Sequence, residues 1–314
     1  MRHLERALAL AAAANGRAYP NPTVGAVVVR DGEVVGEGVT EEYGGRHGEI
    51  VALDAAAARA LGSTLYLTME PCTHHGRTPP CVERVVAAGI ARVVAASRDP
   101  NPAAKGGLEH LREQGVEVEL RDLWEARRQN EAWRTWVGRR RPFVVYKAAA
   151  TLDGRTTLPG ERWVSGEESR RLVHTLRAEM DAVAVGMGTV RAEEPRLDAR
   201  GVPTPRGQPR RLAFGRGPLP PGSELELRVA PLAEELRALA GDGVQSLLLE
   251  GGPTLATAFL DADLVDKVLV FVAPRLAGAG PGVVSALRSV RTLSRLAARP
   301  VGEDVLLEAY VHEP

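Results

Sequence analysis

The first half of the chain alternates between segments with helical periodicity and segments with strand periodicity. Apolar spacing predicts a helix over residues 3–14, which a following Asn-Gly pair ends. Valine-rich runs at residues 23–30 and 33–39 predict a hairpin around an Asp-Gly turn. Further helices are predicted at residues 48–61, 82–88 and 108–114, and further strands at 64–69, 92–97 and 116–120. This alternation favours a three-layer α/β/α domain.

The second half begins after a helical segment, residues 123–141, which ends in a basic cluster before Pro142. We place a domain boundary there, which gives domains of residues 1–142 and 143–314. Strands are predicted at residues 143–149, 181–185, 245–249 and 267–272, and helices at 167–179, 232–240 and 254–260. The stretch 194–222, rich in Pro, Arg and Gly, is predicted to be a surface loop with one short strand near residues 211–214.

Charge and composition narrow the classes of partner. The 314 residues include 40 basic and 40 acidic side chains, so the formal net charge is zero. A balanced charge gives no broad attraction to nucleic acid or to a membrane surface, although it leaves small phosphorylated molecules open as ligands. The N-terminal apolar run is short, and no stretch approaches the roughly 18–20 apolar residues of a membrane span. We therefore expect a cytoplasmic protein.

A candidate metal site lies in the first half. His47 and Glu49 open a predicted helix, Cys72 follows a strand, and Cys81 opens another helix. One imidazole and two thiolates make a three-ligand zinc site whose fourth position stays open for water, as in catalytic zinc sites. Zinc lowers the pKa of its water and so produces hydroxide near neutral pH. Glu49 is placed to move protons between that water and a departing amine.

Two structural interpretations compete with this catalytic one. Cys72 and Cys81 could form a disulfide, and His74 or His75 could complete a structural zinc site. A related structural interpretation is that zinc only stabilises a non-catalytic scaffold. In that case Glu49→Gln would leave function intact. The signature of zinc deaminases is His-x-Glu with Pro-Cys-x-x-Cys. Here eight residues separate the cysteines, which departs from that signature.

The second half contains two glycine-rich turns between a predicted strand and a predicted helix. They are residues 186–189, with the sequence GMGT, and residues 250–254, with the sequence EGGPT. Each places free main-chain N–H groups at a helix start, where a phosphate can bind. Either turn by itself is equally consistent with ordinary turn chemistry, and neither has the GxGxxG spacing of a dinucleotide fingerprint. Together they indicate a phosphorylated cofactor.

The sequence resembles a known family at several points. The segment PCTHHGRTPPC at residues 71–81, PNPTVG at 20–25 and DPNP at 99–102 closely resemble the bifunctional riboflavin-biosynthesis deaminase/reductase family. The resemblance implies a cytidine-deaminase-like first domain that binds one zinc ion through His47, Cys72 and Cys81, with Glu49 as the proton shuttle. It also implies that the pyrimidine and the ribose phosphate contact Asn21, His74, Arg77, Asp99 and Asn101.

The resemblance continues through the second domain, from KAAATLDGRT at residues 147–156 to the Glu250 turn. It implies a dihydrofolate-reductase-like α/β domain that uses NADPH, with Lys147 and Glu250 as catalytic or substrate-orienting residues. The implied substrate contacts are Ser165, Arg177, Leu197, Arg200 and Glu250. The implied cofactor contacts are Ala149, Trp163, Thr189, Glu193, Gly252, Pro253, Thr254, Leu255, Ala256, Thr257 and Ala258.

Some positions depart from the family pattern. Glu193 begins a Glu-Glu-Pro run where the family usually has Asp-Asp-Pro, and the strand ending at Phe214 lacks the Asp that commonly follows it. The first departure concerns the expected contact of Glu193 with the cofactor. The second indicates a shortened loop after the strand that ends at Phe214. Lys147 could instead be a strand-end lysine whose ammonium reaches solvent.

Taken together, the resemblance implies an enzyme for two consecutive steps of riboflavin synthesis. The first domain would deaminate a small phosphorylated diaminopyrimidine, and the second would reduce its ribosyl group to ribityl with NADPH. We expect a homo-oligomer, a dimer or a tetramer, that binds neither nucleic acid nor membrane. The alternative is a nucleoside or base deaminase whose second half is a non-catalytic nucleotide-binding module; it predicts no NADPH oxidation.

Overall fold

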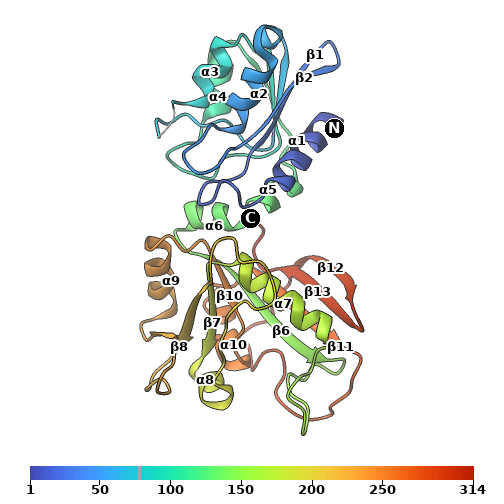
Figure 1. Cartoon of the computed structure of the whole chain (residues 1–314), viewed down its shortest axis with the longest axis vertical. Helices are drawn as coiled ribbons and strands as arrows, with labels where there is room; N and C mark the ends of the chain where they lie inside the picture. Colours follow the sequence, from blue (N-terminus) through green and yellow to red (C-terminus); the bar gives the residue numbers. More distant parts are fainter. Residues whose placement is uncertain (77–78) are drawn as a thin grey trace. The chain divides into compact units, whose positions relative to one another are not determined.

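The computed structural model describes residues 1–76 and 79–314. They divide into two compact units, residues 1–139 and 140–313, each with its own sheet (Figure 1). The domain boundary expected at Pro142 lies close to this division. Each unit is described by itself below.

The first unit is built on a five-stranded sheet with the order β2-β1-β3-β4-β5. Its strands are β1 (Gly25–Arg30), β2 (Glu33–Val39), β3 (Thr64–Leu67), β4 (Arg92–Ala95) and β5 (Glu117–Leu120). β1 runs antiparallel to β2 and β3, whereas β3, β4 and β5 are parallel. The carboxyl ends of the three parallel strands therefore open at one edge of the sheet, where sites in α/β folds are commonly built.

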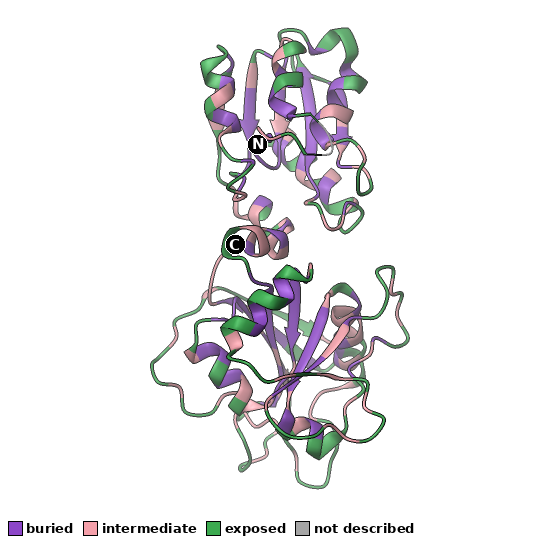
Figure 2. Ribbon diagram, turned by 90° about the vertical axis from the view of Figure 1, so that its left-hand side faces the viewer, coloured by how far each residue is buried: buried purple, intermediate pink, exposed green. Residues whose placement is uncertain are grey.

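Helices cover both faces of this sheet. They are α1 (Arg2–Ala13), α2 (Gly48–Ala56), the 3-10 helix η1 (Ala57–Ala60), α3 (Cys81–Ala87), α4 (Gly107–Glu113), α5 (Trp124–Gln129) and α6 (Glu131–Arg139). Leu53, Val82 and Leu111 from α2, α3 and α4 share one core cluster with the sheet. Leu4 of α1 and Ala126 of α5 pack with β4 in another cluster. The three-layer α/β/α prediction is confirmed, and Figure 2 shows the strands largely buried between helices.

Two predicted helices of the first unit are divided. The helix expected over residues 48–61 ends at Ala57, whose φ of 48° is left-handed, and continues only as a 3-10 turn. The helix expected over residues 123–141 breaks at Asn130, where φ is −120°. The buried Asn130 amide binds both the main-chain N–H and the C=O of Thr23, at 2.9 and 3.0 Å. The second break thus accompanies a long-range contact that helical periodicity does not encode.

The second unit contains an eight-stranded sheet with the order β12-β13-β11-β6-β10-β7-β8-β9. Its strands are β6 (Phe143–Thr151), β7 (Ala182–Gly186), β8 (Arg210–Phe214), β9 (Glu226–Arg228), β10 (Ser246–Leu249), β11 (Lys267–Ala273), β12 (Ser294–Val301) and β13 (Asp304–Tyr310). The strands from β11 to β9 are parallel, and β12 and β13 run antiparallel at the other end.

The helices of the second unit are α7 (Glu167–Glu179), α8 (Met187–Glu193), α9 (Leu232–Gly241) and α10 (Pro253–Asp261). Leu236 of α9 and Phe259 of α10 join Tyr146 and Leu212 of the sheet in one core cluster. The Phe214 and Phe259 rings meet edge to face with centroids 5.4 Å apart, a favourable aromatic geometry. The prediction of an α/β fold is confirmed for this unit also.

Three strands of the second unit were not predicted from the sequence. β9 lies just after the Pro-rich stretch that was predicted to be loop, and the β12–β13 hairpin lies beyond the last predicted strand at residues 267–272. Most of β12 is exposed, so it lacks the alternation of buried and exposed residues that identifies a strand in sequence. β12 forms because it pairs with β13, which itself pairs with β11.

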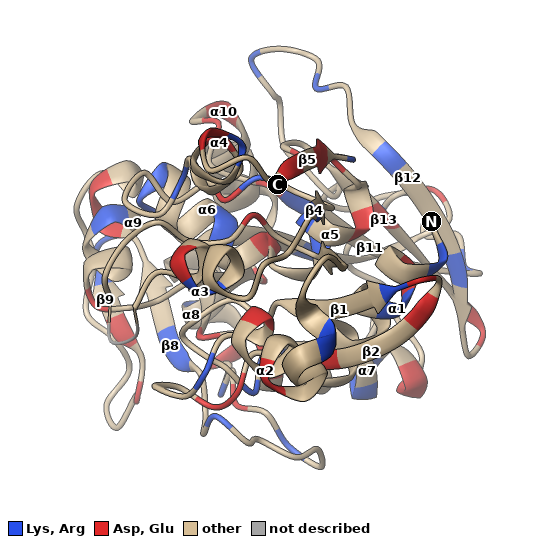
Figure 3. Ribbon diagram, turned by 90° about the horizontal axis from the view of Figure 1, so that it is seen from above, with Lys and Arg blue, Asp and Glu red and all other residues tan. Residues whose placement is uncertain are grey.

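Charged side chains of both signs are intermixed along the chain (Figure 3), as the balanced composition predicts. Across residues 1–76 and 79–314, no helix has the length and apolar character needed to cross a membrane.

A buried ion pair anchors the start of the second unit. The Arg141 guanidinium donates to both carboxylate oxygens of Asp266, at 2.6 and 2.7 Å. The Arg141 side chain is 9% exposed and that of Asp266 1% exposed. Asp266 also accepts the main-chain N–H of Val144 at 2.8 Å, which ties this pair to the first residues of β6.

We expect Arg141→Ala to lower the free energy of unfolding of the second unit by about 3–5 kcal/mol, because it leaves the Asp266 carboxylate buried without its counter-charge. Urea denaturation of the full chain measures this change. Arg140→Ala is the matched control, since Arg140 is exposed, and it should cost under about 0.5 kcal/mol. Equal destabilisation by the two variants would contradict the importance of the buried pair.

Candidate functional site

The three predicted metal ligands of the first unit come together. His47 Nδ1 lies 3.1 Å from Cys81 Sγ and 3.7 Å from Cys72 Sγ. Ligand atoms of the three residues all lie within 4.8 Å of one another. Both cysteines are free thiols, so the disulfide interpretation is wrong. Each ligand sits at the start of a helix or just after a strand, since His47 precedes α2 and Cys81 opens α3.

The cluster fits a zinc ion. Tetrahedral zinc with Zn–N and Zn–S bonds of about 2.0 and 2.3 Å separates neighbouring ligand atoms by roughly 3.6 Å, close to the spacings of His47 from both thiols. Hydrogen bonding with Cys81 lowers the pKa of Cys72, which favours a thiolate there. The set has one nitrogen and two sulfur donors, as in zinc sites that keep a position open.

Glu49 lies in the first turn of α2, beside the cluster, and is 3% exposed. Its Oε2 is buried and has no hydrogen-bond partner among the described residues. Burial raises the pKa of Glu49 to about 7; a bound cation would act in the opposite direction. A carboxylate oxygen that is desolvated and unpartnered beside a metal cluster is suited to receive a proton from a water molecule.

Gly48 allows this arrangement. A Cβ at Gly48 would lie 2.3 Å from the main-chain oxygen of Val24, so a larger residue would push α2 away from the end of β1. The absence of a side chain between His47 and Glu49 therefore lets the helix start close against the sheet.

A cavity of about 290 Å³ opens over the cluster. The predicted residues that line it are Asn21, His47, Glu49, Cys72, His74, Asp99 and Asn101. Arg77, which was predicted to contact the substrate, lies outside the described residues. The cavity is close to the lower end of the range for small-molecule sites, about 300–1,000 Å³.

The second unit gathers its predicted catalytic residues around a buried carboxylate. Glu250 follows β10, and its side chain is 7% exposed. It accepts from Lys147 Nζ at 3.1 Å and from Arg177 Nε and Nη2 at 2.6 and 3.0 Å. Burial by itself raises the pKa of Glu250, but the charges of Lys147 and Arg177 outweigh it and hold the pKa at about 2. Glu250 is therefore ionised at neutral pH.

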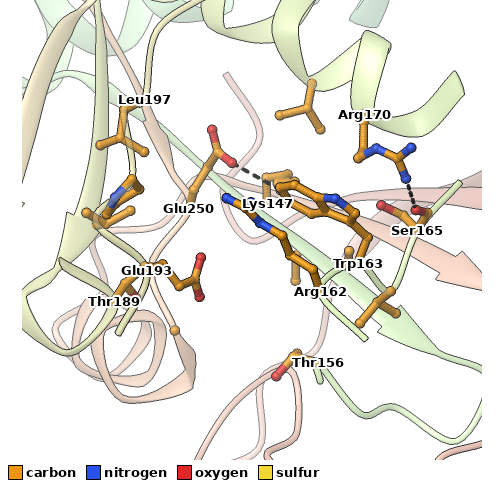
Figure 4. Close-up of a pocket in the computed structure, with 18 of the residues that line it drawn as sticks. Lys147, Thr156, Arg162, Trp163, Ser165, Arg170, Thr189, Glu193, Leu197 and Glu250 are labelled. Atoms are coloured by element: carbon orange, nitrogen blue, oxygen red, sulfur yellow. Dashed lines mark hydrogen bonds and ion pairs between the residues drawn. The ribbon is translucent and has the colours of Figure 1, made fainter. Parts of the chain in front are cut away.

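These residues lie at a cavity of about 500 Å³. Figure 4 shows Lys147 and Glu250 joined by their ion pair. Thr189, Glu193 and Leu197 come from segments on one side of this view, and Arg162, Trp163 and Ser165 from the other. The predicted residues that line the cavity are Lys147, Ala149, Trp163, Ser165, Arg177, Thr189, Glu193, Leu197, Arg200, Glu250, Gly252 and Pro253.

The remaining predicted cofactor contacts, residues 254–258, are not among those that line this cavity. Ala256 is fully buried in the core, and the Thr257 hydroxyl accepts the main-chain N–H of Ser285. Both predicted glycine-rich turns do start helices, since Gly186 is the N-cap of α8 and Gly252 that of α10. The Ala256 N–H already donates to the Gly252 oxygen, so a cofactor contact in the first turn of α10 would involve the main-chain N–H groups of Thr254 and Leu255.

Comparison with known proteins gives the family. The family model described as RibD C-terminal domain matches residues 142–307. The model described as cytidine and deoxycytidylate deaminase zinc-binding region matches residues 1–97. Riboflavin biosynthesis protein RibD from Aquifex aeolicus is 38% identical over 343 residues, which cover 97% of this chain and 96% of that protein. The chain belongs to the RibD family.

Other RibD proteins agree in sequence and in fold. RibD from Mycobacterium tuberculosis is 41% identical over 85% of this chain and 82% of its own. A deaminase/reductase from Thermotoga maritima whose crystal structure is solved is 32% identical in sequence to this chain. The structural match covers 98% of this chain and 97% of that one, with a TM-score of 0.80. RibD from Acinetobacter baumannii, form 1, gives a TM-score of 0.81 at 30% identity, covering 98% of this chain and 99% of that one.

Membership in the RibD family confirms the predicted activities and cofactors. The chain is a bifunctional enzyme of riboflavin biosynthesis, with a zinc-dependent deaminase domain and an NADPH-dependent reductase domain, and it acts on a small molecule. The interpretation of the second half as a non-catalytic module is not favoured, because that half matches the RibD reductase domain.

Sequence reasoning missed the residue that holds Asp99 in this RibD deaminase cavity. The buried Glu70 accepts the main-chain N–H of Asp99 at 3.1 Å and that of Leu108 at 3.0 Å. It thereby joins the loop after β4 to the start of α4. Burial raises the pKa of Asp99 to about 6. A glutamate directly before the Pro-Cys pair was the available sequence signal, but its partners, two main-chain N–H groups and the Arg98 guanidinium at 3.3 Å, lie far along the chain.

The other missed residues form an aromatic wall of the same cavity. Trp133, Trp136 and Val137 of α6 and Tyr43 of the loop after β2 line it. Trp133 packs with Val24 and Met69 and is 8% exposed. The spacing of Trp133 and Trp136 on one helix face was visible in the sequence, but such spacing is more often a sign of core packing.

Removing a proposed ligand should remove the metal. We expect Cys72→Ser and His47→Ala to reduce zinc from about one per chain to far below that, because two remaining ligands cannot close the site. Elemental analysis of the purified chain measures the zinc content. His75→Ala is the control, since His75 is exposed in the same loop, and it should keep its zinc. If His75→Ala lost its zinc while Cys72→Ser and His47→Ala kept theirs, the proposed ligand set would be wrong.

Proposed function

We propose that the first domain, residues 1–142, hydrolyses the ring amine of a diamino-hydroxy-phosphoribosylamino-pyrimidine, and that the second, residues 143–314, reduces the deaminated product. The Thermotoga maritima neighbour bears the name of this deaminase and of 5-amino-6-(5-phosphoribosylamino)uracil reductase. The observation that carries the proposal is the position of Glu49, which lines one cavity with His47 and Cys72 of the metal cluster and whose Oε2 has no hydrogen-bond partner among the described residues.

In the deamination, a C–O bond forms from water to the ring carbon, and the C–N bond to the amine breaks. Zinc, when bound, acts as the Lewis acid that makes water reactive near neutral pH. Glu49 takes a proton from the attacking water and delivers it to the amine nitrogen, which leaves as ammonia. The carboxylate is regenerated, so the proton count balances over one cycle.

The remaining cavity residues bind and orient the substrate. We assign the polar edge of the pyrimidine to Asn21, whose amide offers both a donor and an acceptor. Asp99 and Asn101 lie on the loop after β4, and Asp99 Oδ1 accepts the N–H of Asn101 at 2.8 Å, which orders that loop. We assign the ribose phosphate to His74, which lines the cavity, and to Arg77, which lies outside the described residues, because imidazole and guanidinium N–H groups donate hydrogen bonds to phosphate.

In the reduction, the ribosylamine opens to an imine-like form whose carbon accepts a hydride and whose nitrogen takes up a proton from water, which gives the amine that bears the ribityl chain. NADPH, when bound, supplies that hydride. Lys147 and Glu250 orient the sugar at this carbon, since their ion pair lies in the cavity. Arg177 and Arg200 neutralise the phosphate, because guanidinium groups suit its geometry. Ala149, Trp163, Thr189, Glu193 and the first turn of α10 would hold the cofactor.

The proposal also covers the oligomeric state of the chain and its location in the cell. We expect a cytoplasmic homo-oligomer, a dimer or a tetramer, that binds no nucleic acid. The balanced charge of 40 basic and 40 acidic residues supports the last point. Light scattering coupled to size exclusion gives the mass of the assembly.

Glu49→Gln should lower the rate of ammonia release by at least about 10²-fold, because glutamine cannot carry a proton. The reductase should keep its full rate when the deaminated intermediate is supplied, as followed by NADPH absorbance. Glu83→Gln, an exposed acidic residue of α3, serves as the control and should leave both rates unchanged. Ammonia release at the normal rate from Glu49→Gln would contradict the proposed mechanism.

Glu250→Gln should lower the reductase kcat/KM on the order of 10²–10³-fold, because it leaves Lys147 and Arg177 without their counter-charge in the cavity. Ammonia release by the same chain is the internal control and should not change. Glu234→Gln, on the exposed side of α9, controls for loss of an acidic residue in this unit. If Glu250→Gln and Lys147→Ala both oxidise NADPH normally, these two residues do not orient the substrate.

A further inference from the structure

One histidine at the reductase cavity has no part in the steps above. Four residues of α7, Arg170, Val173, His174 and Arg177, line the cavity from one face of the helix. Their spacing of three and four residues places them in line along that face. Arg177 holds Glu250. His174, one turn earlier, contacts the loop that carries Leu197 and Arg200 instead.

His174 binds the main chain of that loop. The main-chain N–H of Arg200 donates to His174 Nδ1 at 3.2 Å. The main-chain oxygen of Asp198 also lies 3.2 Å from this nitrogen, and it accepts from Arg177 Nη1 at 3.1 Å. Two consecutive turns of α7 thus hold positions 198 and 200 of the loop.

The two contacts require opposite states of Nδ1, which donates to the Asp198 oxygen only when it carries a proton and accepts from Arg200 only when it does not. Because the Asp198 oxygen already accepts from Arg177 Nη1, an unprotonated Nδ1 satisfies both main-chain groups. We therefore place the proton of the neutral imidazole on Nε2. Burial, together with the positive charges of Arg177 and Arg200, lowers the pKa of His174. The Asp198 carboxylate, paired with Arg200 Nε at 3.3 Å, is the acidic group that faces it. The neutral form that the Arg200 contact requires is therefore the favoured one.

Other contacts also fix the conformation of this loop around residues 197–199. Gln208 exchanges two hydrogen bonds with the main chain of Ala199, at 2.8 and 2.9 Å. Leu197 has a left-handed φ of 55° and is 2% exposed, a conformation that persists only where its surroundings hold it. The Arg200 side chain, by contrast, is 53% exposed. Its location at the cavity is consequently set by where its main chain is held and by the Asp198 carboxylate, 3.3 Å from its Nε.

We propose that His174 is a positioning residue of the reductase: its unprotonated Nδ1 holds the main-chain N–H of Arg200 and so directs the Arg200 guanidinium toward the phosphate of the substrate. The inference rests on the proposed role of Arg200 as a phosphate contact. It adds a determinant of substrate affinity that does not itself touch the substrate.

The test compares His174→Asn with His174→Gln. The side-chain oxygen of asparagine can take the place of Nδ1, whereas that of glutamine reaches the place of Nε2 and leaves Arg200 without its acceptor. We expect His174→Gln and His174→Ala to raise KM for the phosphorylated substrate about tenfold, as the loss of one hydrogen bond would. His174→Asn should restore KM. kcat, KM for NADPH and ammonia release should stay as in the parent chain.

Arg200→Ala separates this inference from the function on which it rests. That variant keeps its main-chain N–H and loses only the guanidinium. If Arg200→Ala leaves KM for the substrate unchanged, the proposed role of Arg200 is wrong. If Arg200→Ala raises KM and His174→Gln then raises it further by the same factor in that background, His174 does not act through Arg200, and the positioning role is wrong. Equal KM values for the Asn and Gln variants would overturn it as well.

Discussion

Each unit of this enzyme buries carboxylates near its site, and a buried carboxylate must be paired because an isolated charge away from water is costly. Glu250 meets this requirement through Lys147 and Arg177, which brings together β6, α7 and the end of β10. Glu70 meets it with main-chain N–H groups of Asp99 and Leu108 and with the Arg98 guanidinium, which joins the ends of β3 and β4 to α4. The positions of the functional residues follow from these pairings.

Glu49 is the exception, and the contrast explains its different role. Its Oε2 is as buried as the others but has no partner among the described residues, so it remains available to a proton in transit. Glu250, held at a pKa of about 2 by its two cationic neighbours, keeps its charge and can only orient. Similar side chains thus perform proton transfer in one unit and electrostatic positioning in the other because their surroundings differ.

Much of the fold could be predicted from the sequence because it depends on the local spacing of apolar and polar residues. α7 was predicted with its observed limits, since its apolar and polar residues alternate with helical period and its ends are well marked. The β12–β13 hairpin was missed because β12 is mostly exposed and is stabilised by pairing alone. The break between α5 and α6 was missed because it accompanies a hydrogen-bonded contact of Asn130 with a residue 107 positions away.

The sequence by itself determined the chemistry: one histidine, two cysteines and a glutamate, spaced so that strand ends and helix starts bring them to one edge of a sheet. The family motifs then named fewer than half of the residues that line each cavity, the proposed catalytic ones among them. Only the tertiary structure decided which residues support them, such as Glu70 beneath Asp99, Trp133 beside the metal cluster and His174 behind Arg200. These contacts join segments far apart in the chain, often through main-chain groups that every residue possesses, and residue identity therefore does not reveal them.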